Sequence, residues 1–330
     1  MRENYYESAV DDPDVPHLWG STDRLSYGPG DTVRFHVNTT ADTWRMRIVR
    51  DGGVLKEVYR SRDISGGLHG TPDDCSVNGC GWPVGFELDI PRDWVSGAYI
   101  VHLLASDRGR DLMYDHMFVL KPEPAGKRPA MLFLCATGTW VSYNNWGGSN
   151  AYEGIIGPDR DRYSPTLSWH RPWARGFCRL PVGAPRAVNP SLPLGAAIRY
   201  PHMEWAYANG FSKKYASAGW ASYDSHFARW AENQGYDFDY ATLHDLHRNP
   251  GLLDGYRCLV LVGHDEYWSW EMRDAVDKWV DQGGRVARFA GNFMWQIRIE
   301  GDNQVCYKYR ARKEDPVYGT DRQNRASHFW

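Results

Sequence analysis

A strand–helix–strand pattern between Arg257 and Gly291 constrains the fold more than any other part of the sequence. The apolar run RCLVLVG precedes SWEMRDAVDKWVDQGG, and RVARFAG follows it. Ser269 is placed to cap the predicted helix, and Gly283-Gly284 to end it. Apolar residues recur at helical spacing at Met272, Ala275, Val276, Trp279 and Val280. Two strands joined by a crossover helix are parallel, so the sequence predicts a parallel α/β sheet with right-handed connections.

The preceding residues extend this pattern. AMLFLCAT is nearly continuous in apolar residues, which is typical of a parallel strand buried on both faces. YDSHFARWAENQG predicts a short helix that ends at Gly235, and YDFDYAT predicts another strand. We therefore expect an α/β domain over residues 123–330.

Residues 1–122 predict an all-β domain. Its strands are expected in DTVRFHVNT, TWRMRIVRD, GFELDI, GAYIVHLLAS and LMYDHMFVL, which alternate in polarity between Gly, Pro and Asp turns. So many short strands in about a hundred residues favour an Ig-like β-sandwich. KPEPAGKRP has the composition of a linker to the α/β domain.

Composition excludes several classes of function. The net charge is -3 with acids and bases spread evenly, so no nucleic-acid surface is predicted. No apolar run approaches the roughly 20 residues of a membrane helix, and the first residues lack the apolar core of a signal peptide. We expect a cytoplasmic protein. Among six cysteines, Cys75 and Cys80 bracket a short loop and are predicted to be free thiols.

Polar side chains follow both strands of the strand–helix–strand pattern. His264, Asp265 and Glu266 come after the first strand, and Asn292 after the second. The carboxyl ends of parallel strands share one rim, where such sheets bind ligands. Glu266 alone could be a first-turn acid, His264 a hydrogen-bonded loop histidine and Asn292 a turn residue. His264 and Glu266 together suit a metal with a proton shuttle, and Asn292 could donate its amide to a polarised carbonyl.

Neighbouring polar residues receive no such role. Asp265 should point away from its two neighbours, because side chains alternate in an extended segment. His244 and His247 are expected at the surface. The position after Gly263 holds no Ser or Cys nucleophile, and the sequence has neither an H-E-x-x-H motif nor a P-loop.

A long irregular segment from Gly138 to about Tyr200 supplies further candidates. Irregular stretches of this length inside a domain are usually functional. It contains Tyr143, Tyr152 and Tyr163. Two tyrosines beside one glutamate would form a hard, anionic, all-oxygen ligand set. Because a free phenol has a pKa of about 10, such a set needs a strong Lewis acid and favours Fe(III) over zinc.

Several of these motifs resemble one known family. GSTDRLSYGPGDTVRFHV, YNNWGGSNAY, LVGHDEYWSWEMRDAVDKWVDQGGRVARFAGN and the RPW at 171–173 resemble the large subunit of N,N-dimethylformamidase and its relatives, over His17 to Arg298. The resemblance implies a β-sandwich joined to an α/β domain similar to class I glutamine amidotransferases. It also implies a mononuclear iron, bound by two tyrosines and a glutamate, and hydrolysis of a small amide.

By this resemblance, Glu266 is the iron glutamate, Tyr143 the first tyrosine and Tyr163 the second, with Tyr152 as its rival. His264 and Asn292 match the catalytic histidine and asparagine. A small partner subunit and a homo-oligomer are also implied. The family's large subunit begins with a further domain and uses an acid from beyond the point matching Trp330, so we expect a truncated chain.

An alternative to the enzyme is a non-catalytic amidotransferase-like protein. Its 16 Trp and 20 Tyr would stack carbohydrate or a partner, with no metal. A stacking surface has no need for His264, Glu266 and Asn292 on one rim, which favours the enzyme.

Overall fold

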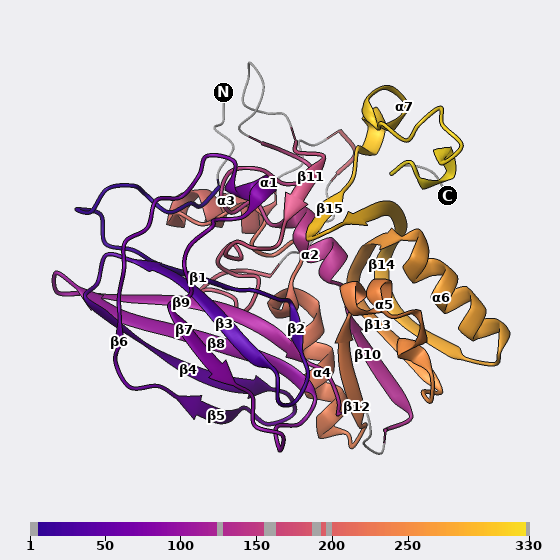
Figure 1. The fold of residues 1–330 in the computed structure, drawn as a ribbon, viewed down its shortest axis with the longest axis horizontal. Coiled ribbons are helices and arrows are strands. Elements are labelled where there is room, and N and C mark those ends of the chain that lie inside the picture. Colours follow the sequence, from indigo (N-terminus) through magenta and orange to yellow (C-terminus); the bar gives the residue numbers. More distant parts are fainter. Residues whose placement is uncertain (1–5, 124–127, 155–162, 187–192, 196–199, 328–330) are drawn as a thin grey trace.

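The computed structural model describes residues 6–123, 128–154, 163–186, 193–195 and 200–327. It is a mixed α/β protein in which a β-rich N-terminal part lies beside a sheet flanked by helices (Figure 1). No helix in these ranges is both long and apolar enough to cross a membrane.

The N-terminal part contains two sheets that lie against each other. One has the order β1 (Leu18–Thr22), β3 (Thr32–Thr39) and β7 (Phe86–Asp89). The other runs β2 (Ser26–Tyr27), β9 (Arg110–Leu120), β8 (Gly97–Asp107), β4 (Thr43–Asp51) and β5 (Lys56–Arg60), with β6 (Ile64–Ser65) on β4. Trp44, Met46 and Ile48 alternate along β4 and are buried. The five predicted strands and the β-rich character are confirmed, and the Ig-like assignment stays a prediction.

The second part is built on a six-stranded sheet. Its order is β11 (Thr166–Ser168), β15 (Asn303–Val305), β14 (Arg285–Glu300), β13 (Cys258–Ser269), β10 (Met131–Cys135) and β12 (Phe238–Thr242). The four strands from β14 to β12 are parallel, as predicted. Helix α6 (Trp270–Asp281) connects β13 to β14, and the Ser269 hydroxyl caps it. The amidotransferase-like assignment stays a prediction.

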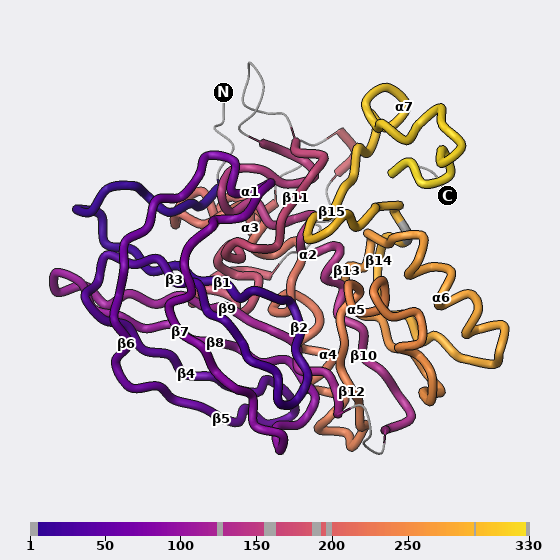
Figure 2. Tube along the Cα trace, in the orientation of Figure 1, coloured from indigo at the N-terminus to yellow at the C-terminus, as the bar shows by residue number. Residues whose placement is uncertain are grey.

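Short helices complete the fold: α1 (Cys75–Asn78), α2 (Thr137–Tyr143), α3 (Pro201–Asn209), α4 (Ser225–Asn233), α5 (Leu243–Arg248) and α7 (Ala311–Glu314). A π-helical turn, η1 (Trp220–Asp224), precedes α4, and single 3₁₀ turns lie at η2 (Pro250–Leu253), η3 (Lys308–Arg310) and η4 (Gln323–Arg325). The trace in Figure 2 shows α2 between the N-terminal sheets and β13, and β11 next to β15.

The two strands that carry the polar candidates are longer than expected. β13 was predicted to end at Gly263, but it continues to Ser269. The register shifts from His264 opposite Gly291 to Asp265 opposite Phe293, so Asn292 is the extra residue of a β-bulge, with φ of 42°. The ladder then resumes and continues to Ser269 opposite Ile297. The polar triplet therefore lies within a strand, beside a bulge, and not at a strand end.

The prediction that His244 lies at the surface is wrong. It is 2% exposed on α5, and its Nδ1 lies 2.8 Å from Thr137 Oγ1. Burial lowers its pKa to about 3. His247 is half-buried, with Nδ1 2.8 Å from Ser269 Oγ. The six-residue helix α5 is covered on most of its circumference, which a short polar sequence could not reveal.

A continuous hydrophobic core runs through both parts of the chain. Trp146 is fully buried and contacts Trp19 and Trp82 edge-on, with ring centroids 5.6 and 5.8 Å away. Trp44, Trp220 and Trp268 are also among the fully buried side chains. Much of the unusual aromatic content therefore belongs to the core.

Candidate active site

Three side-chain oxygens from separate segments meet at one point, and we call them the oxygen cluster. The Tyr152 hydroxyl donates to Glu266 Oε2 at 2.8 Å and lies 2.8 Å from the Tyr143 hydroxyl oxygen. The Tyr143 hydroxyl lies 3.3 Å from the same Oε2 atom. The buried Tyr267 donates its hydroxyl to Tyr152 at 2.7 Å. Glu266 lies on β13 and Tyr143 ends α2, so the parallel sheet and the helix after β10 create this meeting point.

Close packing of α2 on β13 depends on Gly138. A Cβ atom added there would lie 2.4 Å from the Tyr267 carbonyl oxygen, which is shorter than any real contact. The absence of a side chain lets the helix approach the strand backbone directly. This approach brings Tyr143 to Glu266.

The segment between the two tyrosines, residues 143–152, is called the tyrosine loop. Asn150 organises it from within: its Oδ1 accepts from the backbone N–H groups of Tyr152 and Glu153 at 2.8 and 2.9 Å, and its Nδ2 donates to the Tyr143 carbonyl at 3.1 Å. These bonds connect both ends of the loop to one side chain, which keeps the two phenols close together.

Arg171, from the RPW motif, holds the tyrosine loop from outside. It is 1% exposed. Its guanidinium donates to the carbonyls of Ser168 (3.0 Å), Ser149 (3.0 Å), Asn144 (2.9 Å) and Trp146. Burial lowers its pKa to about 10, so the group stays charged at neutral pH. A buried cation bound to backbone carbonyls stabilises an irregular loop that lacks the regular backbone hydrogen bonds of a helix or a sheet.

His264 and Asn292 border the oxygen cluster. His264 Nδ1 lies 3.1 Å from the Ser217 carbonyl oxygen, which can only accept, so Nδ1 carries a proton. Its Nε2 lies 3.2 Å from Glu266 Oε2 and 3.3 Å from Asn292 Nδ2. Nε2 is therefore the ring nitrogen that can exchange a proton with a molecule at the cluster.

Asp265 points to the opposite side of the strand, as predicted. Its Oδ1 accepts from Arg288 at 2.9 Å, and the same guanidinium nitrogen donates to the Asn292 carbonyl. Burial raises the pKa of Asp265 to about 6, although Arg288 opposes the shift. This ion pair secures the bulge that turns Asn292 toward His264.

Two lysines provide positive charge beside the phenols. Lys308 Nζ lies 3.5 Å from the centroid of the Tyr152 ring, and Lys214 Nζ lies 4.7 Å from it. Burial lowers the pKa of both ammonium groups, that of Lys308 to about 8. Burial alone would raise the pKa of Glu266, but the His264 hydrogen bond, Lys308 and Tyr152 together lower it. Glu266 is thus held as an anion.

The phenols themselves are held neutral. Burial, followed by the charge of Glu266, raises the pKa of Tyr143 well above its usual value. Burial, the neighbouring Tyr143 and Glu266 raise that of Tyr152 further. Only a strong compensating cation at the oxygen cluster would release both protons.

Four of the five predicted site residues lie together: Tyr143, His264, Glu266 and Asn292. Tyr163 donates its hydroxyl to the Tyr307 carbonyl, and its rival Tyr152 is the tyrosine that joins the oxygen cluster. Sequence reasoning missed Tyr267, Lys214 and Lys308. Tyr267 follows Glu266 directly in HDEY, so its position next to a candidate ligand could have identified it. Nothing in the local sequence pattern singles out either lysine.

Among the described residues, no group of three or more His, Cys, Asp or Glu side chains is arranged to hold a metal ion. The oxygen cluster has a different composition, with two phenols and one carboxylate. The described cysteines, Cys75 and Cys80 included, are free thiols.

The fold and the site define a mixed α/β protein with a carboxylate–tyrosine cluster at a bulge between parallel strands. The chain belongs to the N,N-dimethylformamidase beta subunit-like, C-terminal family, which matches residues 55–330. It is similar to the N,N-dimethylformamidase beta subunit of an Alcaligenes species, with 25% identity over 246 residues, covering 73% of this chain and 31% of the relative. The corresponding protein of Paracoccus aminophilus is 27% identical over 235 residues, covering 68% of this chain and 29% of the relative.

The chain thus spans about a third of the length of these relatives. Among solved structures, a Parabacteroides merdae β-glucuronidase matches 82% of this chain and 22% of its own at 9% identity, with a TM-score of 0.22. A polysaccharide monooxygenase from M. thermophila matches 32% of this chain and 55% of its own at 15% identity, with a TM-score of 0.20. Similarities this low carry no inference about the fold.

Proposed function

We propose that this protein hydrolyses a small amide to an amine and a carboxylate with the help of a mononuclear iron(III). The relatives' name, N,N-dimethylformamidase, makes N,N-dimethylformamide the candidate substrate. The convergence of Tyr143, Tyr152 and Glu266 carries the proposal. Their oxygens are separated by 2.8, 2.8 and 3.3 Å. Oxygen ligands of one ion, at bond lengths of about 2.0–2.2 Å, lie about 2.8–3.6 Å apart for bond angles between tetrahedral and octahedral values.

The donor set also fits the chemistry of iron(III). Two phenols and a carboxylate are hard oxygen ligands, and they are anionic once the phenols lose their protons. The raised phenol pKa values mean that a weak Lewis acid would leave them protonated. Lys308 and Lys214, above the rings, favour the anionic state of the set. Tyr152 therefore replaces Tyr163 as our second tyrosine ligand.

When bound, iron(III) would supply Lewis acidity toward a carbonyl oxygen or a water molecule. The surrounding residues then have separate tasks. His264, oriented by the Ser217 carbonyl, would take a proton from water and give it to the leaving amine through Nε2. Asn292, fixed by the bulge, would donate its amide N–H to the oxygen on which negative charge develops.

The relatives are named as beta subunits, which implies an assembly with another subunit. We propose that this chain also acts in a complex, with a small partner subunit, further copies of itself, or both. Because the chain covers about a third of the relatives' length, the activity of the complete enzyme is likewise part of the proposal.

Metal analysis tests the proposal directly. Protein purified from iron-replete cells should contain one iron per chain and show a visible phenolate-to-iron absorption band. Glu266→Gln should lose the iron and the band. The matched control is Glu271→Gln, whose 43%-exposed side chain lies in the first turn of α6 and pairs with Arg325. A colourless wild-type protein without iron would refute the iron proposal, and amine release from N,N-dimethylformamide tests the substrate.

A further inference from the structure

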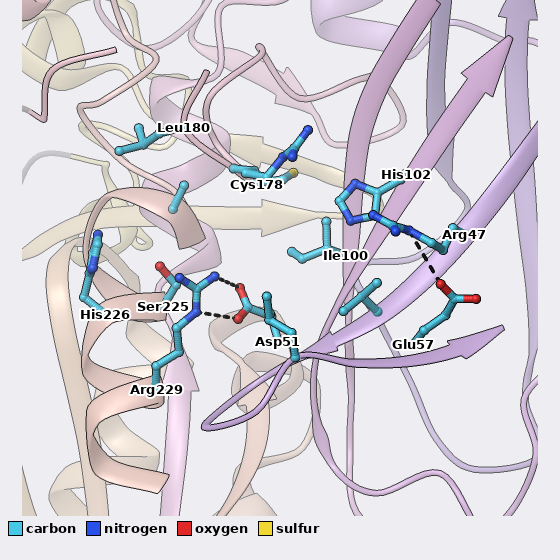
Figure 3. A pocket seen from close by; sticks show the side chains of 14 residues that line it. Arg47, Asp51, Glu57, Ile100, His102, Cys178, Leu180, Ser225, His226 and Arg229 are labelled. Carbon is cyan, nitrogen blue, oxygen red and sulfur yellow. Dashed lines mark hydrogen bonds and ion pairs between the residues drawn. The ribbon is translucent and has the colours of Figure 1, made fainter. Parts of the chain in front are cut away.

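A cavity of about 430 Å³ lies away from the oxygen cluster, and none of the cluster's residues line it. It is bounded by β4 and β8 of the N-terminal part and by α4 and the segment around Cys178–Leu180 of the second part (Figure 3). Its volume falls within the range of about 300–1,000 Å³ that is typical of small-molecule sites. Three arginines and two histidines line it: Arg47, Arg179, Arg229, His102 and His226.

Arg47 is the least satisfied of these cations. Its Nε atom is buried and has no hydrogen-bond partner, although 41% of the side chain as a whole is exposed. The nearest carboxylate is Glu57, 3.9 Å from Nε. Glu57 is already engaged by Arg60, which donates to its two oxygens at 2.9 and 2.8 Å. A buried donor without a partner is costly, and such a group usually faces a water molecule or a ligand.

Three other cations of the cavity, Arg229, Arg179 and His102, are held in fixed positions. Arg229 donates to both oxygens of Asp51 at 2.7 and 2.8 Å, as Figure 3 shows. Arg179 and His102 Nδ1 contact the two oxygens of Asp115 at 2.8 and 2.6 Å. These carboxylates balance Arg229 and Arg179, so Arg47 is the one lining arginine without a hydrogen-bonded carboxylate. Arg47, whose ion pair with Glu57 is long at 3.9 Å, is thus the lining guanidinium best able to accept one further carboxylate, which suits a monoanion.

Apolar side chains line much of the rest of the cavity, beside the polar Ser225 and Glu57. Val49 and Ile100 contribute from β4 and β8, and Leu55 and Leu180 from the rim. An inorganic anion has no apolar surface to bury against such walls, whereas an organic acid would bury its carbon chain against them. We propose that the cavity binds a small organic monocarboxylate, with its carboxylate on Arg47 and its apolar body between Ile100 and Leu180. A planar carboxylate suits the fork of a guanidinium group.

Saturation-transfer difference NMR with hexanoate tests this binding on the full chain. Saturable binding of hexanoate is expected. Inorganic phosphate should not compete with it, and 1-hexanol should bind with much lower affinity than hexanoate. Arg47→Met should weaken binding about ten- to a hundredfold, the range for a hydrogen bond to a charged group. Arg45→Met is the matched control, because Arg45 lies two residues earlier on the same face of β4, is 64% exposed and pairs with Asp63. It should change affinity by less than about twofold.

A second variant separates binding from folding. Leu180→Glu adds a negative charge to the wall of the cavity and leaves every arginine in place. It should also weaken hexanoate binding, while its thermal unfolding temperature stays close to that of the wild type. The proposal is overturned if hexanoate shows no saturable binding, if Arg47→Met binds as the wild type does, or if phosphate displaces hexanoate at equal concentration. None of these outcomes depends on iron at the oxygen cluster.

Discussion

Replacement of Arg171 by methionine tests whether one buried cation holds the tyrosine loop in its observed conformation. The guanidinium is 1% exposed and has hydrogen bonds to four backbone carbonyls. Those of Asn144, Trp146 and Ser149 belong to the loop. Methionine has a similar length but no donor, so these carbonyls would be left without their partner.

The expected magnitude follows from these bonds. A hydrogen bond to a charged group contributes about 1.5–3 kcal/mol, so four would sum to about 6–12 kcal/mol. The variant also no longer has to bury a charge, and water can reach some of the released carbonyls. A buried acceptor left without its donor costs about 1–3 kcal/mol, so with part of the four carbonyls rehydrated we expect a loss of about 3–5 kcal/mol. This is a large fraction of the roughly 5–15 kcal/mol that stabilises a typical domain.

Urea unfolding followed by circular dichroism measures the free energy of unfolding, and hydrogen exchange reports on the amides of residues 144–151. Arg171→Met should lower the free energy of unfolding by about 3–5 kcal/mol and remove the protection of these amides. Arg179→Met is the control: its side chain is 45% exposed, so it should lose less than about 1 kcal/mol. The reasoning fails if Arg171→Met is no less stable than Arg179→Met, or if the loop amides keep their protection.

Three further outcomes are expected. Tyr152→Phe should abolish the visible absorption band of iron-loaded protein while Tyr163→Phe retains it, and the reverse result would restore Tyr163 as the ligand. Lys308→Met should weaken iron retention about tenfold in a chelator competition, because it removes a cation beside the phenols; unchanged retention would contradict this role. Burial alone would raise the pKa of Asp245, but Lys121 and further hydrogen bonds lower it. This depressed pKa stabilises the fold above the usual carboxyl range and the benefit is lost as pH falls through the folded value. Asp245→Asn should therefore lower the free energy of unfolding at pH 7, and the difference between the wild type and the variant should narrow below about pH 4. A difference that does not change with pH would contradict this.

Regular elements were predictable because their patterns are local. The alternation in β4 and the 3.6-residue period of α6 depend only on which face of one element is buried. The burial of His244 depends on what packs around a six-residue helix, and no periodicity in six residues records that. Lys308 reaches the oxygen cluster from a short turn with φ of 48°, far along the chain from Tyr152.

The choice between Tyr152 and Tyr163 shows a similar limit. Both lie in an irregular segment, where no period relates sequence position to direction. The decision depends on Arg171 and Asn150, whose side chains bind the backbone of the tyrosine loop and bring Tyr152 back beside Tyr143. Such side-chain-to-backbone bonds determine a loop conformation only when both partners have been placed in three dimensions.

The side-chain directions in the polar triplet of β13 were predicted correctly, although its local structure was not. His264 and Glu266 were expected at the elbow after a strand, and they lie instead within the strand, beside a bulge. In either backbone they are two residues apart in an extended segment, so both side chains point the same way and Asp265 points the other. The position of Asn292 does require the bulge: without the extra residue, the alternation of β14 past Gly291 would be reversed. The bulge, secured by Asp265 and Arg288, thus determines the orientation of Asn292, which side-chain alternation along β14 could not predict.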